Sequence, residues 1–271
     1  MGKITYEETN LVSRHRGTMP AILTCPHGGD KQPPGVPNPR TGAGLPADCR
    51  FEPDTDRFTR TITRGVAQLL FDVFGEAPYV VIANFDRAFI DANRRARDKC
   101  AFEDPDAQPF YEEYHNTIRN FVDEIRADNG GIGLLFDIHG TTEIEQDKAD
   151  VYLGTLNGKA ISSLKSRDSL AMARRRSLPG LLRGAGHVVS AKVPETLQGD
   201  FTPETYGSFN ADGVDAIQIE IESALRIDDS KRDVFIEDLA YAISSLIARY
   251  ADTPALVAFR SANFLPRLQR G

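Results

Sequence analysis

The chain has 271 residues, of which 32 are Lys or Arg and 39 are Asp or Glu, so its formal net charge is −7. An acidic chain has no general attraction for nucleic acid or for an anionic membrane surface. The N-terminus has no signal-peptide pattern, and no uncharged apolar run approaches membrane-spanning length. We therefore expect a cytoplasmic protein without nucleic-acid or membrane partners, and we make no prediction of its oligomeric state.

The three cysteines, Cys25, Cys49 and Cys100, are widely spaced and form no C-x-x-C pair. An odd number with this spacing argues against a disulfide framework and against a cysteine-rich zinc site. We therefore expect reduced thiols. A metal-free thiol hydrolase built on Cys25 is a remote alternative, because a nucleophilic thiol needs an accessible, electropositive setting and Cys25 ends an apolar run.

Apolar runs and helical spacings alternate along the chain. Residues 21–25 (AILTC) have the composition of a buried strand, and the Gly-, Pro- and Asp-rich stretch 28–53 is typical of a long functional loop. Further along the chain, the same criteria predict helices at 56–74, 109–128 and 234–250, and strands at 79–83, 132–138, 151–153, 187–190 and 216–221.

This alternation favours an α/β layered fold with a largely parallel central sheet, which we expect to form a single domain over residues 1–271. In such folds ligands gather beyond the carboxyl ends of the strands. Polar residues that follow the apolar runs are therefore the first candidates for a functional site. The basic triplet 174–176 is instead expected to lie on a solvated surface.

Two histidines stand at predicted strand ends, His27 after the first strand and His139 at the end of the third. Two imidazoles and one carboxylate are a common ligand set for a catalytic zinc, which leaves a position for a water of lowered pKa. In the H-x-x-D pattern, a tight turn with two glycines lets His27 and Asp30 converge on one ion. Asp137, two positions before His139, points to the same side of its strand and can orient the imidazole.

Asp56 offers a second possibility for the acidic ligand. It belongs to the sequence Asp54-Thr55-Asp56, which precedes a predicted helix. Asp and Thr at such a position commonly cap the helix by accepting hydrogen bonds from its free amides. The alternative is that Asp56 faces the metal and replaces or joins Asp30.

The strand at 217–222 carries a polar face. Period-two alternation places Gln218, Glu220 and Glu222 on one side and three isoleucines on the other. Two carboxylates on one strand face need water, counter-charges or a metal site to offset their desolvation. Glu220 is our candidate general base, which takes a proton from the attacking water and passes it to the leaving nitrogen. An edge strand with a hydrated acidic face is the alternative.

The segment 84–94 (NFDRAFIDANR) follows a predicted strand and contains two arginines. Arginine is well suited to form a fork of hydrogen bonds to a carboxylate or a developing oxyanion. Because the chain is acidic overall, an anionic substrate needs such local arginines. Solvated loop arginines are the alternative interpretation.

Six motifs occur in the same order as in a known family. PHGG, DTD, FDRAFIDANR, YEEYH, FDIHG and QIEI, between residues 26 and 221, resemble the N-formylglutamate amidohydrolase family. That family is related at fold level to zinc carboxypeptidases and to the aspartoacylase and succinylglutamate desuccinylase group. The resemblance implies a three-layer αβα fold, one zinc ion, and hydrolysis of N-acyl amino acids or related amides.

The resemblance also assigns roles at the metal and at the reacting bond. His27 and His139 would bind the zinc, with Asp30 in the place of the acidic residue in the H-x-x-E pattern of the carboxypeptidase relatives. Arg87 would stabilise the tetrahedral intermediate, and Glu220 would be the catalytic carboxylate.

For the substrate, the resemblance implies that Asn93 and Arg94 hold the carboxylate. Tyr111 and His115 match a tyrosine–histidine element of the family and are further candidates for substrate binding. A structural role for a helical His115, satisfied by a neighbouring group, is an equal alternative.

The leading hypothesis is therefore a zinc-dependent amidohydrolase that uses metal-activated water to cleave an N-acyl amino acid such as N-formylglutamate, a small carboxylate-bearing substrate. A close alternative is a zinc peptidase of carboxypeptidase type, including one that acts on cell-wall peptides. A third alternative is a non-catalytic relative that binds a carboxylate ligand. Retention of Glu220, Arg87 and both histidines argues against that binder, which needs no general base.

Overall fold

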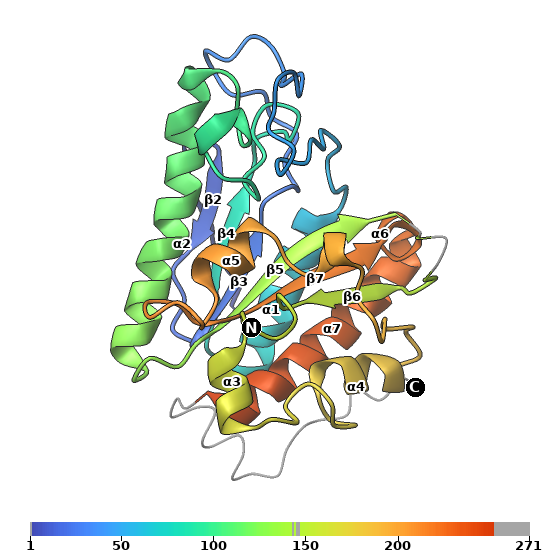
Figure 1. Ribbon diagram of the computed structural model, residues 1–271. Coiled ribbons are helices and arrows are strands. Elements are labelled where there is room, and N and C mark those ends of the chain that lie inside the picture. Colours follow the sequence, from blue (N-terminus) through green and yellow to red (C-terminus); the bar gives the residue numbers. More distant parts are fainter. Residues whose placement is uncertain (1, 143, 145–146, 252–271) are drawn as a thin grey trace.

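A computed structural model describes residues 2–142, 144 and 147–251 of the chain (Figure 1). The last residues of the predicted domain, 252–271, lie outside this description. In the described ranges the strands are β1 (Glu7–Thr9), β2 (Val12–His15), β3 (Ala21–Cys25), β4 (Tyr79–Ala83), β5 (Leu134–Thr141), β6 (Val151–Gly154) and β7 (Asp215–Glu222).

These strands form one sheet with the order β1-β2-β4-β3-β5-β7-β6. The central strands β4, β3, β5 and β7 pair in parallel, whereas β1, β2 and β6 add antiparallel at the two edges. Every residue of β3 and β4 is buried, as expected for parallel strands covered on both faces. The prediction of a largely parallel central sheet is thus confirmed.

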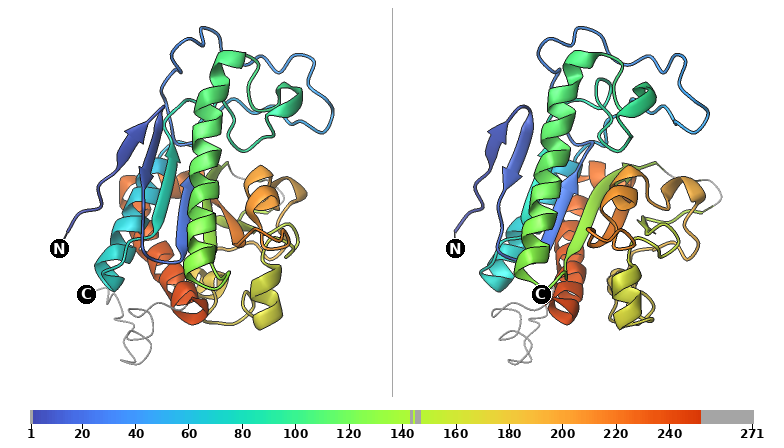
Figure 2. Two further views of the ribbon diagram at one scale, coloured as in Figure 1. Left: turned by 90° about the vertical axis from the view of Figure 1, so that its left-hand side faces the viewer. Right: turned by 60° about the vertical axis from the view of Figure 1, so that its left-hand side comes forward.

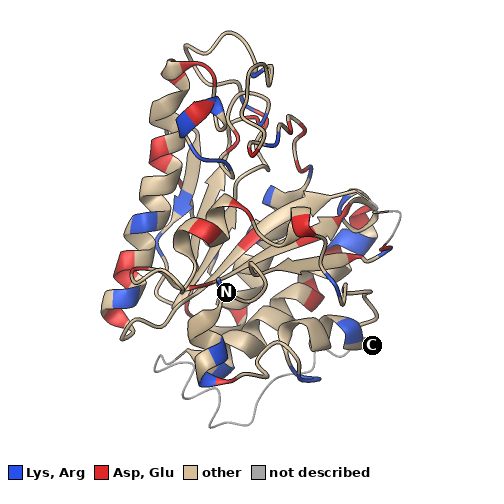
Figure 3. Ribbon diagram, viewed as in Figure 1, with Lys and Arg blue, Asp and Glu red and all other residues tan. Residues whose placement is uncertain are grey.

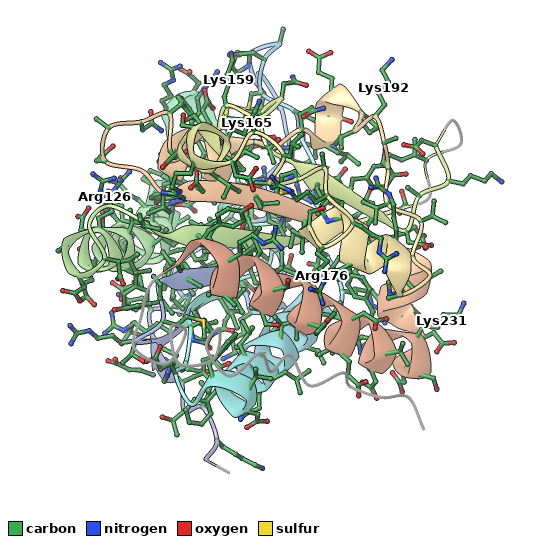
Figure 4. The ribbon with its side chains drawn as sticks, turned by 90° about the horizontal axis from the view of Figure 1, so that it is seen from below. Arg126, Lys159, Lys165, Arg176, Lys192 and Lys231 are labelled. Carbon is green, nitrogen blue, oxygen red and sulfur yellow. A yellow bond between two sulfur atoms is a disulfide. The ribbon has the colours of Figure 1, made fainter. Side chains whose placement is uncertain are left out.

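Helices cover both faces of this sheet. The α-helices are α1 (Thr59–Phe74), α2 (Gln108–Asp128), α3 (Ser162–Arg167), α4 (Leu178–Gly184), α5 (Phe201–Tyr206), α6 (Ser223–Ile227) and α7 (Asp229–Tyr250), and the 3-10 turns are η1 (Arg97–Lys99), η2 (Pro105–Ala107) and η3 (Glu195–Leu197). Figure 2 shows α2 on one side of the sheet and α1 and α7 on the other, and Figure 4 shows α1 and α7 side by side from below.

Two apolar cores result from this layering. Ile22 and Leu23 are neighbours on β3 and point to opposite faces, as the two-residue period of a strand requires. Ile22 packs in the core that includes Ile118 of α2, and Leu23 packs in the core that includes Ile62 of α1 and Leu239 of α7. The three-layer αβα architecture is therefore confirmed.

The expected helices and the strands at 21–25, 79–83, 132–138, 151–153 and 216–221 are present, with shifts of a few residues at their ends. The prediction of a strand at 187–190 is wrong, because this segment makes only an isolated bridge between Val189 and Val151. Its polar side chains bind elsewhere: His187 Nε2 lies 2.9 Å from Asp238, and Ser190 donates to Asp147. The edge strands β1 and β2 were not predicted from their polar sequences.

A disulfide joins Cys49, in the long loop after β3, to Cys100, in the segment after β4. The expectation of three reduced thiols is therefore wrong for this pair. Sequence spacing could not indicate the bond, because 51 residues separate the two cysteines and the fold brings their Cα atoms to 5.7 Å. Cys25 is a free, buried thiol.

Charged residues of both signs are mixed over the elements. Figure 3 shows acidic and basic residues alternating along α2. The basic triplet 174–176 is exposed before α4, where Figure 4 labels Arg176, and it does not approach the site described below. None of the helices in the described part of the chain is long and apolar enough to cross a membrane.

Candidate active site

Three buried residues converge beyond the carboxyl ends of β3 and β5. His27 follows β3, His139 lies near the end of β5, and Asp56 precedes α1. Asp56 Oδ2 lies 3.3 Å from His27 Nδ1 and 3.5 Å from His139 Nδ1, and the two imidazole rings are 4.9 Å apart. The possible ligand atoms all lie within 4.8 Å of one another, so these three residues can hold one metal ion.

Backbone contacts place Asp56 in this cluster. Its amide donates to the His27 carbonyl, and its carbonyl accepts a hydrogen bond from the Thr59 hydroxyl at the start of α1. Its carboxylate accepts a hydrogen bond from the Gly140 amide at 2.9 Å. No side chain caps the amides of α1, whose N-cap residue is Phe58. Asp56 therefore faces the histidines and does not act as a helix cap.

Asp30, the other proposed acidic ligand, does not lie in the cluster. Its side chain is 72% exposed, and its carboxylate lies 3.7 Å from Arg60. The turn after His27 does not close as expected, because residues 29–31 continue as an extended segment bonded to the end of β4. The amides of Asp30 and Lys31 both donate to Asn84 there. This path directs the Asp30 side chain to solvent and corrects the H-x-x-D prediction.

A buried carboxylate binds the far nitrogen of each histidine. His139 Nε2 lies 2.8 Å from Asp137, as predicted from their spacing on one strand face. His27 Nε2 lies 2.7 Å from Asp91, a contact that the sequence analysis missed. Asp91 is in turn held by Arg87, whose Nε donates to it at 3.1 Å. The i,i+4 spacing of Arg87 and Asp91 was the only signal in the sequence.

The donor set fits a divalent metal ion of the zinc type. Each imidazole turns Nδ1 toward Asp56, while its Nε2 faces Asp91 or Asp137, the arrangement that fixes a metal-binding histidine. Burial alone would lower the pKa of His139, but the charge and hydrogen bond of Asp137 outweigh burial and raise this pKa well above its usual value. The cluster thus offers excess negative charge to a cation.

Glu220 faces the cluster from the neighbouring strand. It pairs in register with His139 across β5 and β7, and its side chain is buried. Burial raises the pKa of Glu220 to about 7, and the negative charge of Asp56 acts in the same direction. Gln218 donates to Glu220 Oε1 at 2.8 Å. A carboxylate with such a pKa is well placed to exchange a proton near neutral pH.

The strand alternation correctly placed Gln218 and Glu220 together, whereas Glu222 has a different role. Glu222 accepts hydrogen bonds from the Ala224 amide and the Ser223 hydroxyl, and it caps α6. The alternative, an edge strand with a hydrated acidic face, does not hold, because β7 lies between β5 and β6 in the sheet.

A cavity of about 250 Å³ opens over Asp56, His139 and Glu220. Three residues predicted from the arginine-rich segment also line it: Arg87, Asn93 and Arg94. The remaining lining residues are Arg50, Glu52, Asp54, Thr55, Gly140, Thr141, Thr142, Thr196, Leu197, Asp200, Gln218 and Arg226. Most of them belong to no motif that indicated a function in the sequence.

The predicted arginines are held by specific partners. Arg87 Nη1 lies 3.5 Å from Asp56 Oδ1, close to the histidine cluster. Arg94 Nη1 donates to Asp200 at 2.7 Å and to the Asn93 carbonyl at the same distance. Asn93 Oδ1 accepts a hydrogen bond from the Thr202 amide at 3.0 Å, which fixes the orientation of its side-chain amide.

Tyr111 and His115 lie behind the cavity wall and do not line it. The Tyr111 hydroxyl donates to the Arg94 carbonyl, and His115 Nε2 binds the Ala92 carbonyl. His115 Nδ1 contacts the hydroxyl of Tyr206 at 2.9 Å. Both side chains therefore hold the backbone on either side of Asn93, which favours the structural interpretation of His115 over direct substrate contact.

The chain is similar to proteins of one known family. A family model described as N-formylglutamate amidohydrolase matches residues 19–108 and 106–226. An N-formylglutamate deformylase of Pseudomonas putida is 24% identical over 264 residues, covering 85% of this chain and 90% of that protein. A Pseudomonas aeruginosa protein of the same name is 25% identical and covers 88% of this chain and 93% of its own length.

Two solved structures share the fold. An N-formylglutamate amidohydrolase from Ralstonia eutropha JMP134 superposes with a TM-score of 0.63 at 14% identity, covering 94% of this chain and 100% of that one. A gene product of Agrobacterium tumefaciens gives a TM-score of 0.60 at 17% identity, covering 96% of this chain and 97% of the other.

Proposed function

Because the chain belongs to the N-formylglutamate amidohydrolase family, we propose that it hydrolyses the amide bond of N-formylglutamate with one zinc ion held by His27, Asp56 and His139. The products would be formate and glutamate. Family membership makes the chain a hydrolase of amide bonds, and the relatives named N-formylglutamate deformylase support the substrate. The cytoplasmic location expected from the sequence remains part of this proposal.

The observation that carries the proposal is the position of Glu220. Its carboxylate enters the same cavity as the buried cluster of Asp56 and His139, from the strand next to that of His139. A site that only binds a ligand has no use for a buried carboxylate with a pKa of about 7. A hydrolytic site needs such a group to move a proton.

Different residues of the chain act in different steps of hydrolysis. A zinc ion bound at the cluster would acidify water and polarise the substrate carbonyl. Glu220 accepts the proton of the attacking water and delivers it to the leaving nitrogen. Arg87, fixed by Asp91 and close to Asp56, presents its guanidinium to the negative charge that develops on the carbonyl oxygen.

Asn93 and Arg94 bind the substrate carboxylate in this proposal. Both line the cavity, and Asn93 is fixed through Thr202. Arg94 already binds one carboxylate, that of Asp200, whose side chain is 44% exposed. The substrate carboxylate would replace Asp200 as the partner of a guanidinium that is oriented in advance.

The first test is metal content and turnover of the purified protein. We expect about one zinc per chain, loss of activity on chelation, and faster hydrolysis of N-formylglutamate than of N-acetylglutamate or a short peptide. Faster hydrolysis of the peptide would instead support the carboxypeptidase-type alternative. Zinc binding without turnover of any of these compounds would support a non-catalytic binder.

The second test concerns the general base. Glu220→Gln should lower kcat about 10²- to 10⁴-fold and leave zinc content unchanged, since Glu220 is not assigned to the metal. Glu222→Gln is the matched control, because Glu222 lies on the same strand but caps α6. If Glu220→Gln kept full turnover, the assignment of the base would be abandoned.

A further inference from the structure

The cations that line the cavity differ in whether they have partners. Arg87 is bound to Asp91 and lies beside Asp56. Arg94 is bound to Asp200 at 2.7 Å. In both cases a carboxylate of the protein already offsets the charge of the guanidinium.

The guanidinium of Arg226 also has partners, but these are backbone carbonyl groups. Its Nε donates to Ile221, Nη1 to Arg57 and Nη2 to Thr141, at 2.6 to 3.0 Å. The side chain is buried against Gly140, where an added Cβ would meet Arg226 Cζ at 2.4 Å. Arg226 therefore joins the ends of β5 and β7 to the start of α1 and has little freedom to turn toward a ligand.

Arg50 is different. It lines the same cavity, it is exposed, and its guanidinium has no hydrogen-bond or ion-pair partner among the residues that the structure describes. A cation that borders a cavity and has no partner is the natural binding group for an anion on the ligand.

The backbone around Arg50 is nevertheless fixed. The Arg50 carbonyl accepts a hydrogen bond from Arg94 Nε at 3.0 Å. On one side, Cys49 is bonded to Cys100, and on the other, the Glu52 carbonyl accepts from Arg40 Nη2 at 3.0 Å. The free side chain of Arg50 therefore extends from a backbone that Arg94 holds, on a wall that is set before the ligand arrives, which reduces the ordering cost of binding.

Arg94 has one nitrogen left for a further partner. Its Nε donates to the Arg50 carbonyl and its Nη1 donates both to the Asn93 carbonyl and to Asp200, so only Nη2 has no partner among the residues that the structure describes. A ligand with two carboxylates needs a second cation for the other group. Arg50 is adjacent, lines the cavity and is free.

We propose that Arg50 determines specificity for N-acyl derivatives of dicarboxylic amino acids, by binding the side-chain carboxylate while Arg94 binds the carboxylate next to the scissile amide. This inference rests on the proposed function and adds the residue that distinguishes an acidic amino acid from its neutral analogue. Charge-assisted, bidentate pairing with arginine is the strongest form of such recognition.

The test compares N-formylglutamate with N-formylglutamine, which differ only in the charge and hydrogen bonding of the side-chain terminus. The wild-type protein should prefer N-formylglutamate. Arg50→Gln should lower kcat/KM for N-formylglutamate about 10- to 100-fold, mainly through KM, and leave N-formylglutamine unchanged. Arg50→Lys keeps the charge but not the two-pronged hydrogen bonding of the guanidinium. Its kcat/KM for N-formylglutamate should lie between those of the wild-type protein and Arg50→Gln.

Arg97→Gln is the matched control, since Arg97 is an exposed arginine outside the cavity whose nearest carboxylate, Asp98, is 3.8 Å away. It should leave both substrates unaffected. The inference for Arg50 would be overturned, with the proposed function left intact, if Arg50→Gln lost kcat/KM equally on both substrates or on neither. The same effect from Arg97→Gln would also overturn it. A wild-type protein inactive on both compounds would overturn the proposed function and this inference with it.

Discussion

His27 has a carboxylate at each ring nitrogen, Asp56 at Nδ1 and Asp91 at Nε2. Its Nε2 lies 2.7 Å from Asp91, which is fully buried and also binds Arg87. Burial raises the pKa of Asp91, but the charge of Arg87 and the hydrogen bond with His27 outweigh burial and hold this pKa well below its usual value. Asp91 is therefore ionised, and it fixes the tautomer in which Nε2 carries the proton and Nδ1 is free to bind a metal ion.

We predict that Asp91→Asn weakens zinc binding about 10- to 100-fold, because the amide no longer fixes the imidazole in this way. Competition with a chromophoric chelator measures the affinity directly. Asp86→Asn is the control: Asp86 lies in the same segment and binds Thr55 and the Ala88 amide, not a histidine. Equal affinity of the Asp91 variant and the wild-type protein would contradict the orienting role.

The residues of the site differ in how far the sequence could predict them. His139 and Glu220 could be placed because both lie on strands, where a two-residue period fixes the direction of a side chain. Asp30 and Asp56 could not be ranked, because their directions depend on the path of the chain after β3. That path is set by bonds between residues 29–31 and the end of β4, which are contacts over a long sequence distance.

At the scale of elements, His115 joins α2 to two other parts of the fold. Its Nε2 binds the Ala92 carbonyl, and its Nδ1 contacts the Tyr206 hydroxyl at the end of α5. Because a carbonyl can only accept, Nε2 carries a proton, and the lowered pKa of the ring keeps Nδ1 unprotonated near neutral pH. Burial lowers the pKa of His115 from 6.5 to about 4.

This pKa predicts a dependence of stability on pH. The unfolded chain binds a proton at His115 below pH 6.5, whereas the folded chain does so only below about pH 4. The contribution of the neutral ring to the free energy of unfolding is therefore complete above pH 6.5 and is lost as the pH falls from 6.5 to 4. The difference between the two pKa values corresponds to about 3 kcal/mol in the free energy of unfolding.

Urea denaturation of the wild-type protein and of His115→Gln, both with a chelator present, checks this contribution. The wild-type free energy of unfolding should fall more steeply between pH 7 and pH 4, by up to about 3 kcal/mol relative to the variant. Other titrating groups are common to both proteins and cancel in the comparison. Parallel pH profiles would show that His115 does not titrate with this shift.

The strands divide into those the sequence could predict and those it could not. β3 and β4 are continuous apolar runs buried on both sides, so composition alone indicates them. β1 and β2 lie at the sheet edge and include polar residues such as Glu7 and Arg14, which pair with each other across the strands. The further partners of β2 are distant in the sequence, namely β4 and, through Arg14, Glu113 of α2, and no local pattern indicates them.

The long loop after β3 is fixed to the segment after β4 by the disulfide between Cys49 and Cys100. We predict that the denatured, unreduced protein shows one reactive thiol, that of Cys25, and that reduction raises the number to three. Titration with a thiol reagent in denaturant measures both numbers. Cys25→Ala, as control, should remove the single thiol and keep the activity, because burial raises the pKa of Cys25 and the thiolate is disfavoured.

Three thiols before reduction would contradict the disulfide. The outcome also bears on the expected cytoplasmic location, since disulfides are rare in a reducing compartment. Loss of the bond by Cys49→Ser should then raise KM for N-formylglutamate more than it lowers kcat, because the cysteine adjoins Arg50 and not the metal cluster.

At the scale of the whole molecule, the net charge of −7 repels a dianionic substrate at long range. Screening limits that repulsion to about 10 Å at ordinary ionic strength, so arginines inside the cavity decide local attraction. Composition predicts no general attraction for nucleic acid, whereas only the folded chain shows which arginines line the cavity. That residues 1–271 form one domain stays a prediction.

The candidate metal site joins parts of the chain that are distant in the sequence, so an ion bound there should affect global stability. His27 and Asp56 stand near the two ends of the long loop between β3 and α1, and His139 lies on β5, so the three side chains meet only in the folded state. An ion that binds the folded but not the unfolded chain stabilises it by about 4 kcal/mol when its free concentration is about 1,000 times its Kd. For a chain of this size, that corresponds to an increase in Tm on the order of 10 °C.

We predict that removal of zinc by a chelator lowers Tm by about this amount and that added zinc restores it. Asp56→Asn should lower the zinc-dependent shift strongly, because Asp56 is the central partner of both histidines. Glu220→Gln should keep the shift while it loses turnover, since Glu220 faces the cluster without belonging to it. A zinc-dependent shift that is the same in Asp56→Asn and in the wild-type protein would place the ion elsewhere, because stabilisation by binding follows the residues that hold the ligand.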